Sequence, residues 1–260
     1  EEYIPYFYEM GKNYSEWFVK KLIPYIDGKY STKSDRDNRG VMGSSLGGLM
    51  TMYMLNHYPD YFSFGGAFST HNPWEYKNIK DLPKRDVKLW LDAGTGEYSG
   101  GKMPDGTIAP YCYAEAARVI TDSYLAKGHV YGKDLFFYEV KDAIHNESDW
   151  AKRLSVPFLL FKGTTEGKIK DIRIDIEAIK DSSGNVVYLA NPIGEFDNGV
   201  RYSLYKTAKY NITEGIINEK GIFKLGGGGS SVITITFGDI ERKITVTSAD
   251  LDNEAKKINK

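Results

Sequence analysis

The chain has 260 residues, 41% hydrophobic and 14% aromatic, which is enough apolar material for a buried core and excludes a mostly disordered protein. The charged residues cancel to a formal net charge of −1, which disfavours nucleic acid or an acidic membrane as a partner. No apolar run approaches the roughly 18 to 20 residues of a membrane span, residues 1–10 do not look like a signal peptide, and the single Cys112 excludes a disulfide framework or multi-cysteine zinc site.

Helical and strand-like segments alternate through residues 1–163. Apolar residues recur at helical spacing in three segments, which are predicted helices: residues 14–25, 49–58 and 111–127. Four short apolar runs are predicted strands: residues 40–42, 62–68, 87–91 and 135–140. Because these runs are mostly apolar along their length, as parallel strands covered on both faces are, we predict an α/β fold with a doubly wound sheet for this part.

The pattern changes after residues 163–167, which we interpret as a linker. Residues 172–177 alternate apolar and polar side chains, and a turn at residues 181–185 leads into a second apolar run, which together predict a β-hairpin. Two further period-2 segments, 232–237 and 242–247, are predicted strands. Several short strands at short spacing predict an all-β sandwich over residues 168–260.

A nucleophile motif lies between the first predicted strand and the helix that follows it. Residues 43–47 read Gly-Ser-Ser-Leu-Gly and fit G-x-S-x-G, with Ser45 at the nucleophile position. Such a serine lies on a tight, strained turn, so we expect side chains at positions 43 and 47 to collide with neighbouring elements. The helix start also predicts that the Leu46 N–H faces an oxyanion during acyl transfer.

A serine nucleophile needs a base and an orienting acid, which in this type of fold follow it in the order acid, then histidine. The strand at 87–91 leads into Asp92 and Glu97, and the strand at 135–140 leads into His145. Acid and base are therefore expected on loops after the carboxyl ends of parallel strands, where such sheets place their sites.

These motifs together resemble a family. Residues 22–26, 35–39 and 43–48, with Leu89 to Glu97 and His145 to Trp150, look like the esterase family of α/β-hydrolases that includes esterase D, feruloyl esterases and the mycolyltransferases. The resemblance covers about residues 3–163. It implies Ser45 as nucleophile, His145 as base and Glu97 as acid, although the family more often has aspartate at the acid position. Asp92 is the alternative acid.

The family's sheet normally begins with strands upstream of the nucleophile, including the loop that donates a second oxyanion N–H. Only 44 residues precede Ser45, so we expect an α/β-hydrolase domain over residues 1–163 that lacks its first strands. Without those strands the sheet is expected to have an open edge and half an oxyanion hole.

Other aromatic and histidine side chains are candidate substrate contacts. His71 and Trp74 follow the strand at 62–68, and Trp150 follows the predicted base, so these three are assigned to substrate binding. His57 is expected at a helix end, His129 on an exposed loop, and Cys112 on a helix face. The predicted chemistry requires no cofactor and no metal.

Residues 210–213, 220–223, 226–229, 232–236 and 244–246 resemble the closing half of a bacterial immunoglobulin-like domain. The resemblance implies an immunoglobulin-like sandwich over residues 168–260, a carbohydrate contact by this domain, and a secreted or cell-surface bacterial protein. It does not imply a nucleotide site, because no Gly-Lys-Ser/Thr follows the glycine run.

The two resemblances together predict a serine carboxylesterase that cleaves feruloyl or acetyl esters of plant-type carbohydrate through an acyl-enzyme on Ser45. Two alternatives stay open. The same triad could transfer the acyl group to a sugar hydroxyl, or the chain could be a carbohydrate-binding or adhesion protein on a degraded hydrolase scaffold.

Overall fold

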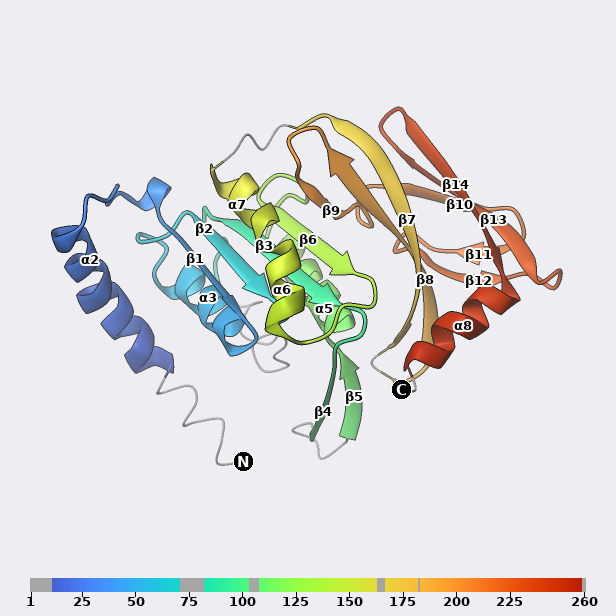
Figure 1. Cartoon of the computed structure of the whole chain (residues 1–260), viewed down its shortest axis with the longest axis horizontal. Helices are drawn as coiled ribbons and strands as arrows, with labels where there is room; N and C mark the ends of the chain where they lie inside the picture. Colours follow the sequence, from blue (N-terminus) through green and yellow to red (C-terminus); the bar gives the residue numbers. More distant parts are fainter. Residues whose placement is uncertain (1–10, 71–81, 103–107, 163–166, 182, 259–260) are drawn as a thin grey trace.

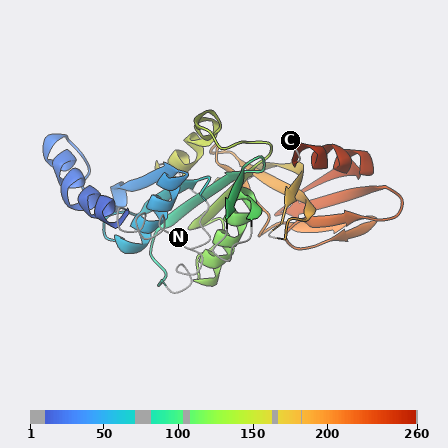
Figure 2. The same ribbon diagram turned by 90° about the horizontal axis from the view of Figure 1, so that it is seen from below.

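A computed structural model describes residues 11–70, 82–102, 108–162, 167–181 and 183–258, with the backbone alone described at 99–102 and 108–111. Three regions follow one another along its longest axis in Figure 1: a helical segment, a parallel sheet with its helices, and a set of antiparallel strands. Figure 2 shows the same order from below.

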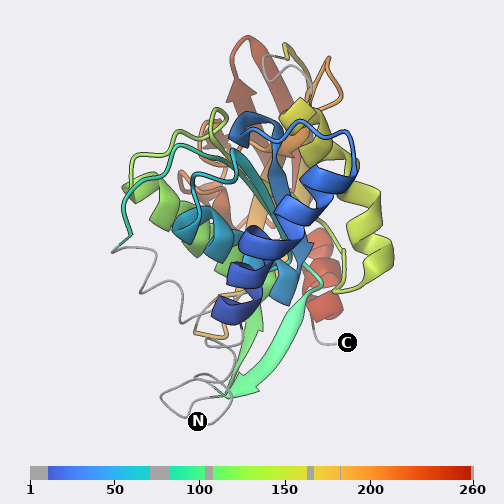
Figure 3. The same cartoon turned by 90° about the vertical axis from the view of Figure 1, so that its left-hand side faces the viewer.

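The first described segment, residues 11–29, is helical throughout. It passes through a π-helical turn at Phe18–Leu22 into α2 (Ile23–Lys29). Pro24 lies just after this wide turn. Because proline lacks an N–H and its ring crowds the carbonyl four residues earlier, it disfavours regular α-helical bonding there. The helix predicted at 14–25 is confirmed. In Figure 3 it crosses in front of the rest of the molecule.

Four parallel strands form the central sheet. They are β1 (Gly40–Ser44), β2 (Phe64–Phe68), β3 (Lys88–Gly94) and β6 (Leu135–Val140), paired in the order β1-β2-β3-β6. All four predicted strands are present, and the α/β prediction is confirmed for this part. Because every strand runs the same way, the four loops that follow them meet at one edge of the sheet.

Helices cover both faces of this sheet (Figure 2). They are α3 (Leu46–His57), α5 (Tyr113–Ala126), α6 (Glu147–Arg153) and α7 (Ser155–Lys162). Leu89 and Leu91 of β3 pack into the same core as residues of α3 and α5, whereas Trp90 between them packs with residues of α7. Successive side chains of a strand point to opposite faces, so burial on both faces explains why these strands are apolar without alternation.

Three local expectations were wrong or incomplete. Residues 111–127 do not form one helix: β4 (Tyr98–Lys102) and β5 (Ile108–Cys112) pair as a hairpin that the sequence did not predict, and α5 begins only at Tyr113. Cys112 therefore ends a strand, and burial raises the pKa of its thiol to about 12. His129 is buried rather than exposed, at 4% of its surface.

Antiparallel strands make up most of the chain after residue 168. These are β7 (Ile169–Lys180), β8 (Val186–Phe196), β9 (Arg201–Ser203), β10 (Lys209–Ile212), β11 (Gly215–Ile217), β12 (Ile222–Leu225), β13 (Ser230–Phe237) and β14 (Ile240–Thr247). They form one sheet around β8 and a second sheet in the order β10-β13-β14, with a shared core.

The predicted β7–β8 hairpin is confirmed. The immunoglobulin-like topology and the domain boundaries stay predictions. The helix α8 (Ser248–Ile258) was not expected.

The β7–β8 hairpin also belongs to the core of the parallel sheet. Ile172 and Ile193 pack in one cluster with Phe136 of β6, whereas Ile176, farther along β7, packs with the second antiparallel sheet. Figure 1 shows the hairpin standing between these two regions. The parallel sheet thus gains one of its covering layers from residues beyond the predicted linker.

A buried ion pair lies at this junction. Arg118 of α5 binds both carboxylate oxygens of Glu139 on β6 at 2.7 Å, and the Glu139 side chain is fully buried. Glu177 of β7 lies beside this pair, and burial together with the Glu139 charge raises the pKa of Glu177 well above its usual range. A raised pKa favours the neutral form of Glu177, which reduces like-charge repulsion between the two carboxyl groups beside Arg118.

This junction predicts a large stability effect of Arg118→Met. The variant leaves Glu139 buried without its cation, so we expect the free energy of unfolding to fall by about 3 to 5 kcal/mol. Lys243→Ala, which removes an ion pair exposed on both sides, is the control and should cost less than about 1 kcal/mol. Urea denaturation measures both, and equal midpoints for the two variants would contradict the assignment.

Candidate active site

Ser45 occupies a strained turn between β1 and α3. Its φ of 55° and ψ of −118° lie where few non-glycine residues are found. A Cβ at Gly43 would lie 2.5 Å from the Gly47 backbone, so position 43 needs glycine, as predicted. The same expectation for Gly47 was wrong, because a Cβ there meets no described atom within 4 Å. The second crowded position is Gly48, whose Cβ would lie 2.9 Å from Thr70.

A backbone hydrogen bond and a helix start lie on either side of the Ser45 turn. The Ser45 N–H donates to Phe68 O at 2.9 Å, which ties the turn to the end of β2. Leu46 is the first residue of α3, and the first four N–H groups of a helix have no partner within it. Leu46 carries one of these N–H groups, and its contact with an oxyanion stays a prediction.

Glu97, the predicted acid, is fully buried after β3. Its Oε1 accepts hydrogen bonds from Ser69 Oγ at 2.7 Å, from the Gly94 N–H at 2.8 Å and from Arg153 Nη2 at 3.2 Å. Its Oε2 lies 2.9 Å from His145 Nδ1. A carboxylate can only accept a hydrogen bond, so this contact matches the imidazole tautomer with its proton on Nδ1. That tautomer has its lone pair on Nε2.

Backbone bonds join the loop of Glu97 to the loop of His145. Thr95 N–H donates to Val140 O and Gly96 N–H to Ala143 O, each at 3.0 Å. A Cβ at Gly94 would lie 2.1 Å from Ala143 O, so only glycine allows the two loops this close. The separation of the acid and the base is therefore set by main-chain contacts.

His145 lies directly before α6, whose start is firmly capped. The Asn146 side chain accepts from the Asp149 N–H at 2.9 Å, and Asp149 accepts from the Ile144 N–H at 2.8 Å. The imidazole is 30% exposed, with the Trp150 ring 5.0 Å away, edge-on. Although both residues belong to the described part of the chain, no hydrogen bond joins the His145 imidazole to the Ser45 hydroxyl.

Asp92, the alternative acid, contacts other groups. Its two oxygens accept from Trp90 Nε1 and from Arg153 Nε, both at 2.9 Å. Burial raises the pKa of Asp92 to about 6, and the Arg153 guanidinium opposes this rise. Of the two acids that the sequence offered, only Glu97 has a hydrogen bond to His145.

Two residues that the sequence analysis missed complete the surroundings of the acid. Ser69 follows β2, is fully buried, and has a φ of 46°; its Oγ donates to Glu97 and accepts from Trp150 Nε1 at 2.8 Å and Arg153 Nη2 at 2.6 Å. Arg153 is the second missed residue. It follows Trp150 by three residues on α6, a spacing that puts both side chains on one face of the helix and could have indicated its place near the site.

Trp150, His71 and Trp74 are the residues predicted to contact the substrate. Trp150 is half-buried and contacts His145 and Ser69, and its contact with substrate stays a prediction. His71 and Trp74 lie outside the described residues. Within the ranges that the structure describes, no group of three His, Cys, Asp or Glu side chains could hold a metal ion, and no helix there is long and apolar enough to cross a membrane.

Comparison with known proteins gives a family match over residues 8–160, with the family described as "Putative esterase". Among curated proteins, the chain is 38% identical over 101 residues to the endo-1,4-beta-xylanase/feruloyl esterase of Xylanibacter ruminicola, a stretch that covers 36% of this chain and 13% of that protein. It is 28% identical over 92 residues to the uncharacterized protein YbbA of Bacillus subtilis, covering 34% and 37%. The chain thus spans well under half the length of these relatives.

Two solved structures are also similar. A ferulic acid esterase shares 19% identity at a TM-score of 0.45, covering 56% of this chain and 60% of the other. The enterobactin esterase FES of Shigella flexneri shares 17% identity at a TM-score of 0.43, covering 58% and 37%.

The shared contacts of Ser69 predict a measurable effect of Ser69→Ala. The change leaves the Trp150 N–H and one Arg153 N–H without their acceptor, so we expect the free energy of unfolding to fall by about 1 to 3 kcal/mol. Ser123→Ala is the matched control, because Ser123 is a buried serine whose hydroxyl only donates to Val119 O within α5. Urea denaturation in which both variants lose the same stability would argue against a shared acceptor at Ser69.

Proposed function

The chain belongs to the esterase family whose pattern it matches over residues 8–160, and from this premise we propose that it is a carboxylic ester hydrolase with Ser45 as nucleophile, His145 as base and Glu97 as acid. The observation that carries the proposal is the 2.9 Å contact between Glu97 Oε2 and His145 Nδ1, at the same sheet edge as the strained Ser45 turn. Sequence order and geometry support the same three residues.

In the proposed mechanism, His145 Nε2 takes the proton of Ser45 as Oγ attacks the ester carbonyl carbon. Glu97 stabilises the imidazolium that forms and keeps its Nδ1 proton in place. The carbonyl oxygen becomes negative in the tetrahedral intermediate and accepts the Leu46 N–H at the start of α3.

Collapse of this intermediate breaks the bond to the alcohol oxygen, which leaves with the proton from His145. The acyl group then remains on Ser45 as an ester. A water molecule gives a proton to His145 and attacks the acyl carbon, and the carboxylic acid departs as Ser45 Oγ recovers its proton. Each proton is returned, so no cofactor is consumed.

For the substrate we propose feruloyl or acetyl esters of plant-type carbohydrate. The support is the relative from Xylanibacter ruminicola, whose name includes feruloyl esterase and whose matched stretch is 38% identical. The pairing of xylanase and esterase in that name is also consistent with a secreted protein that acts on polysaccharide. Carbohydrate contact by the antiparallel strands after residue 168 is part of the same proposal.

A fluorophosphonate probe tests the nucleophile directly. We expect the probe to label Ser45, as mapped by peptide mass spectrometry, and Ser45→Ala to lower kcat/KM for methyl ferulate by about 10³-fold or more. Ser44→Ala is the matched control, because it changes the neighbouring serine on β1 and leaves the turn residue in place. Labelling that persists in Ser45→Ala, or is lost in Ser44→Ala instead, would remove Ser45 from this role.

A second comparison separates the two acids. Glu97→Gln keeps the size of the side chain but presents an amide to Nδ1, which favours the wrong histidine tautomer, so kcat should fall by about 10² to 10⁴-fold. Asp92→Asn, which alters a carboxyl that does not contact His145, should cost less than about tenfold. Steady-state kinetics in which the Asp92 variant is the more damaged would reverse the assignment.

A further inference from the structure

Tyr113, the first residue of α5, contacts both the predicted acid and the predicted base. Its main-chain N–H donates to Glu97 O at 3.0 Å. Its ring lies 4.7 Å from the His145 imidazole, measured between the ring centroids, with an angle of 47° between the two planes. Aromatic rings at this separation attract each other when they are tilted or offset, so the ring contact is favourable. Tyr113 thus joins the same two residues that the carboxylate–imidazole hydrogen bond joins.

The β4–β5 hairpin determines where Tyr113 lies. Glu97 directly precedes β4, and Tyr113 directly follows β5. Tyr98 and Cys112 pair at the base of the hairpin, and the bond from the Tyr113 N–H to Glu97 O continues this pairing by one step. In Figure 1 the hairpin reaches away from the parallel sheet. The position of Tyr113 relative to the acid is therefore set by main-chain contacts at the hairpin base.

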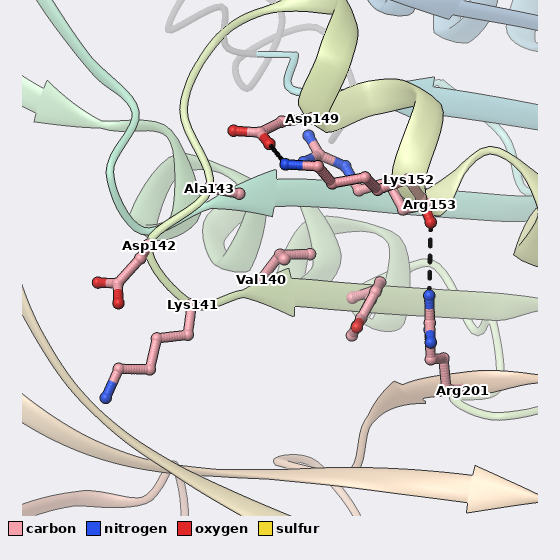
Figure 4. Close-up of a pocket in the computed structure, with 9 residues that line it drawn as sticks. Val140, Lys141, Asp142, Ala143, Asp149, Lys152, Arg153 and Arg201 are labelled. Carbon is pink, nitrogen blue, oxygen red and sulfur yellow. Dashed lines mark hydrogen bonds and ion pairs between the residues drawn. The ribbon is translucent and has the colours of Figure 1, made fainter.

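The loop that carries His145 borders a cavity of about 200 Å³ (Figure 4). Residues 141–143, just before His145, and Asp149, shortly after it, line this cavity. A segment beside empty space has fewer packed neighbours to hold it, so the position of its side chains depends more on their individual contacts. For the imidazole these contacts are the acid and two aromatic rings.

A single hydrogen bond does not fix the plane of an imidazole. The ring can still tilt about the line that joins Glu97 Oε2 to His145 Nδ1, and a tilt changes the direction of Nε2. The rings of Tyr113 at 4.7 Å and Trp150 at 5.0 Å restrict this tilt, because a turned imidazole would lose contact or collide with them. Tyr113 is half-buried and packs against the core shared by α3 and α5, so its own ring is held in place.

We propose that Tyr113 is a positioning residue for His145, an inference that rests on the proposed function of the triad. Its ring keeps Nε2 in the direction needed to take the Ser45 proton. An aromatic face also favours a positive charge within about 6 Å, and the imidazole becomes positive only as that proton arrives. The contact is therefore stronger in the transition state than before it, which predicts an effect on kcat rather than on KM.

Steady-state hydrolysis of methyl ferulate by the full chain tests this role. Tyr113→Leu keeps an apolar side chain but removes the ring, so kcat should fall about tenfold while KM changes less than about threefold. Tyr113→Phe keeps the ring and should retain kcat within about threefold. Tyr61→Leu is the matched control and should leave kcat unchanged. Tyr61 is also half-buried against the same core, but it precedes β2 and so lies at the sheet edge opposite the triad loops.

Three kinetic outcomes overturn the proposal. The first is an unchanged kcat in Tyr113→Leu. The second is an equal loss of kcat in Tyr61→Leu or in Tyr113→Phe, because the ring contact would then not be the cause. The third is a rise in KM at constant kcat, because Tyr113 would then contact the substrate instead of positioning the base.

Nuclear magnetic resonance gives a readout that does not depend on hydrolysis. The Nδ1–H signal of His145, identified among the four histidines by its loss in His145→Gln, should be sharp in the unsubstituted chain and in Tyr113→Phe but broadened in Tyr113→Leu. Equal sharpness in all three overturns the positioning role, whether or not the ester is hydrolysed. Broadening in Tyr113→Leu without any ester hydrolysis supports the positioning role and contradicts the proposed function instead.

A measurement on the unsubstituted chain covers the case in which Tyr113→Leu does not fold. The ring protons of Tyr113 and His145 should then show a nuclear Overhauser contact, as expected for centroids 4.7 Å apart. Absence of that contact overturns the proposal.

Discussion

The buried guanidinium of Arg153 is the interaction on which the rest of the site depends. A charge with 1% of its surface exposed must be compensated inside the protein, and Asp92 within β3 and Glu97 in the loop that follows β3 compensate it. Glu97 is thereby held with one oxygen saturated, so that only its second oxygen can face His145. A buried ion pair adds little net stability, because removing two charges from water is costly. In this site the ion pair fixes the direction of a single carboxylate. The same arginine brings α6, and with it Trp150, against the loop after β2.

The loops after β3 and β6, which carry the acid and the base, lie very close together. The loop of Glu97 and the loop of His145 are joined by main-chain bonds, and Gly94 is the position where they approach too closely for any side chain. Catalysis of acyl transfer needs the acid and the base held to within a fraction of an ångström, which hydrogen bonds between backbones achieve better than mobile side chains. Ser45 and Ser69 both have positive φ at the ends of adjacent strands, so strain is concentrated at the edge where the proposed chemistry takes place.

Much of this arrangement could be predicted from the sequence, because its signals are local. Apolar runs gave the four parallel strands, and the order serine, acid, histidine placed Ser45, Glu97 and His145 after three of them. Ser69 could not be found this way, since a positive φ at a serine has no sequence signature and its partners are 28 to 84 positions away along the chain. The β4–β5 hairpin was missed because its strand Ile108–Cys112 runs directly into α5 without a glycine or other break in the pattern. Burial of His129 depends on contacts with Tyr124, five residues earlier, that polarity alone does not predict.

The position of the β7–β8 hairpin changes how the chain beyond residue 168 is to be understood. Composition alone suggested an appended module on a linker, yet Ile172 and Ile193 share a core with Phe136 of the parallel sheet. Ser203 of β9 accepts the N–H of Glu139, and so satisfies a backbone group at the outer edge of β6. An isolated fragment from residue 168 onward would expose the apolar face that contains Ile172 and Ile193, so its binding properties would not represent those of the whole chain. The antiparallel strands are therefore part of what stabilises the sheet that carries Glu97 and His145.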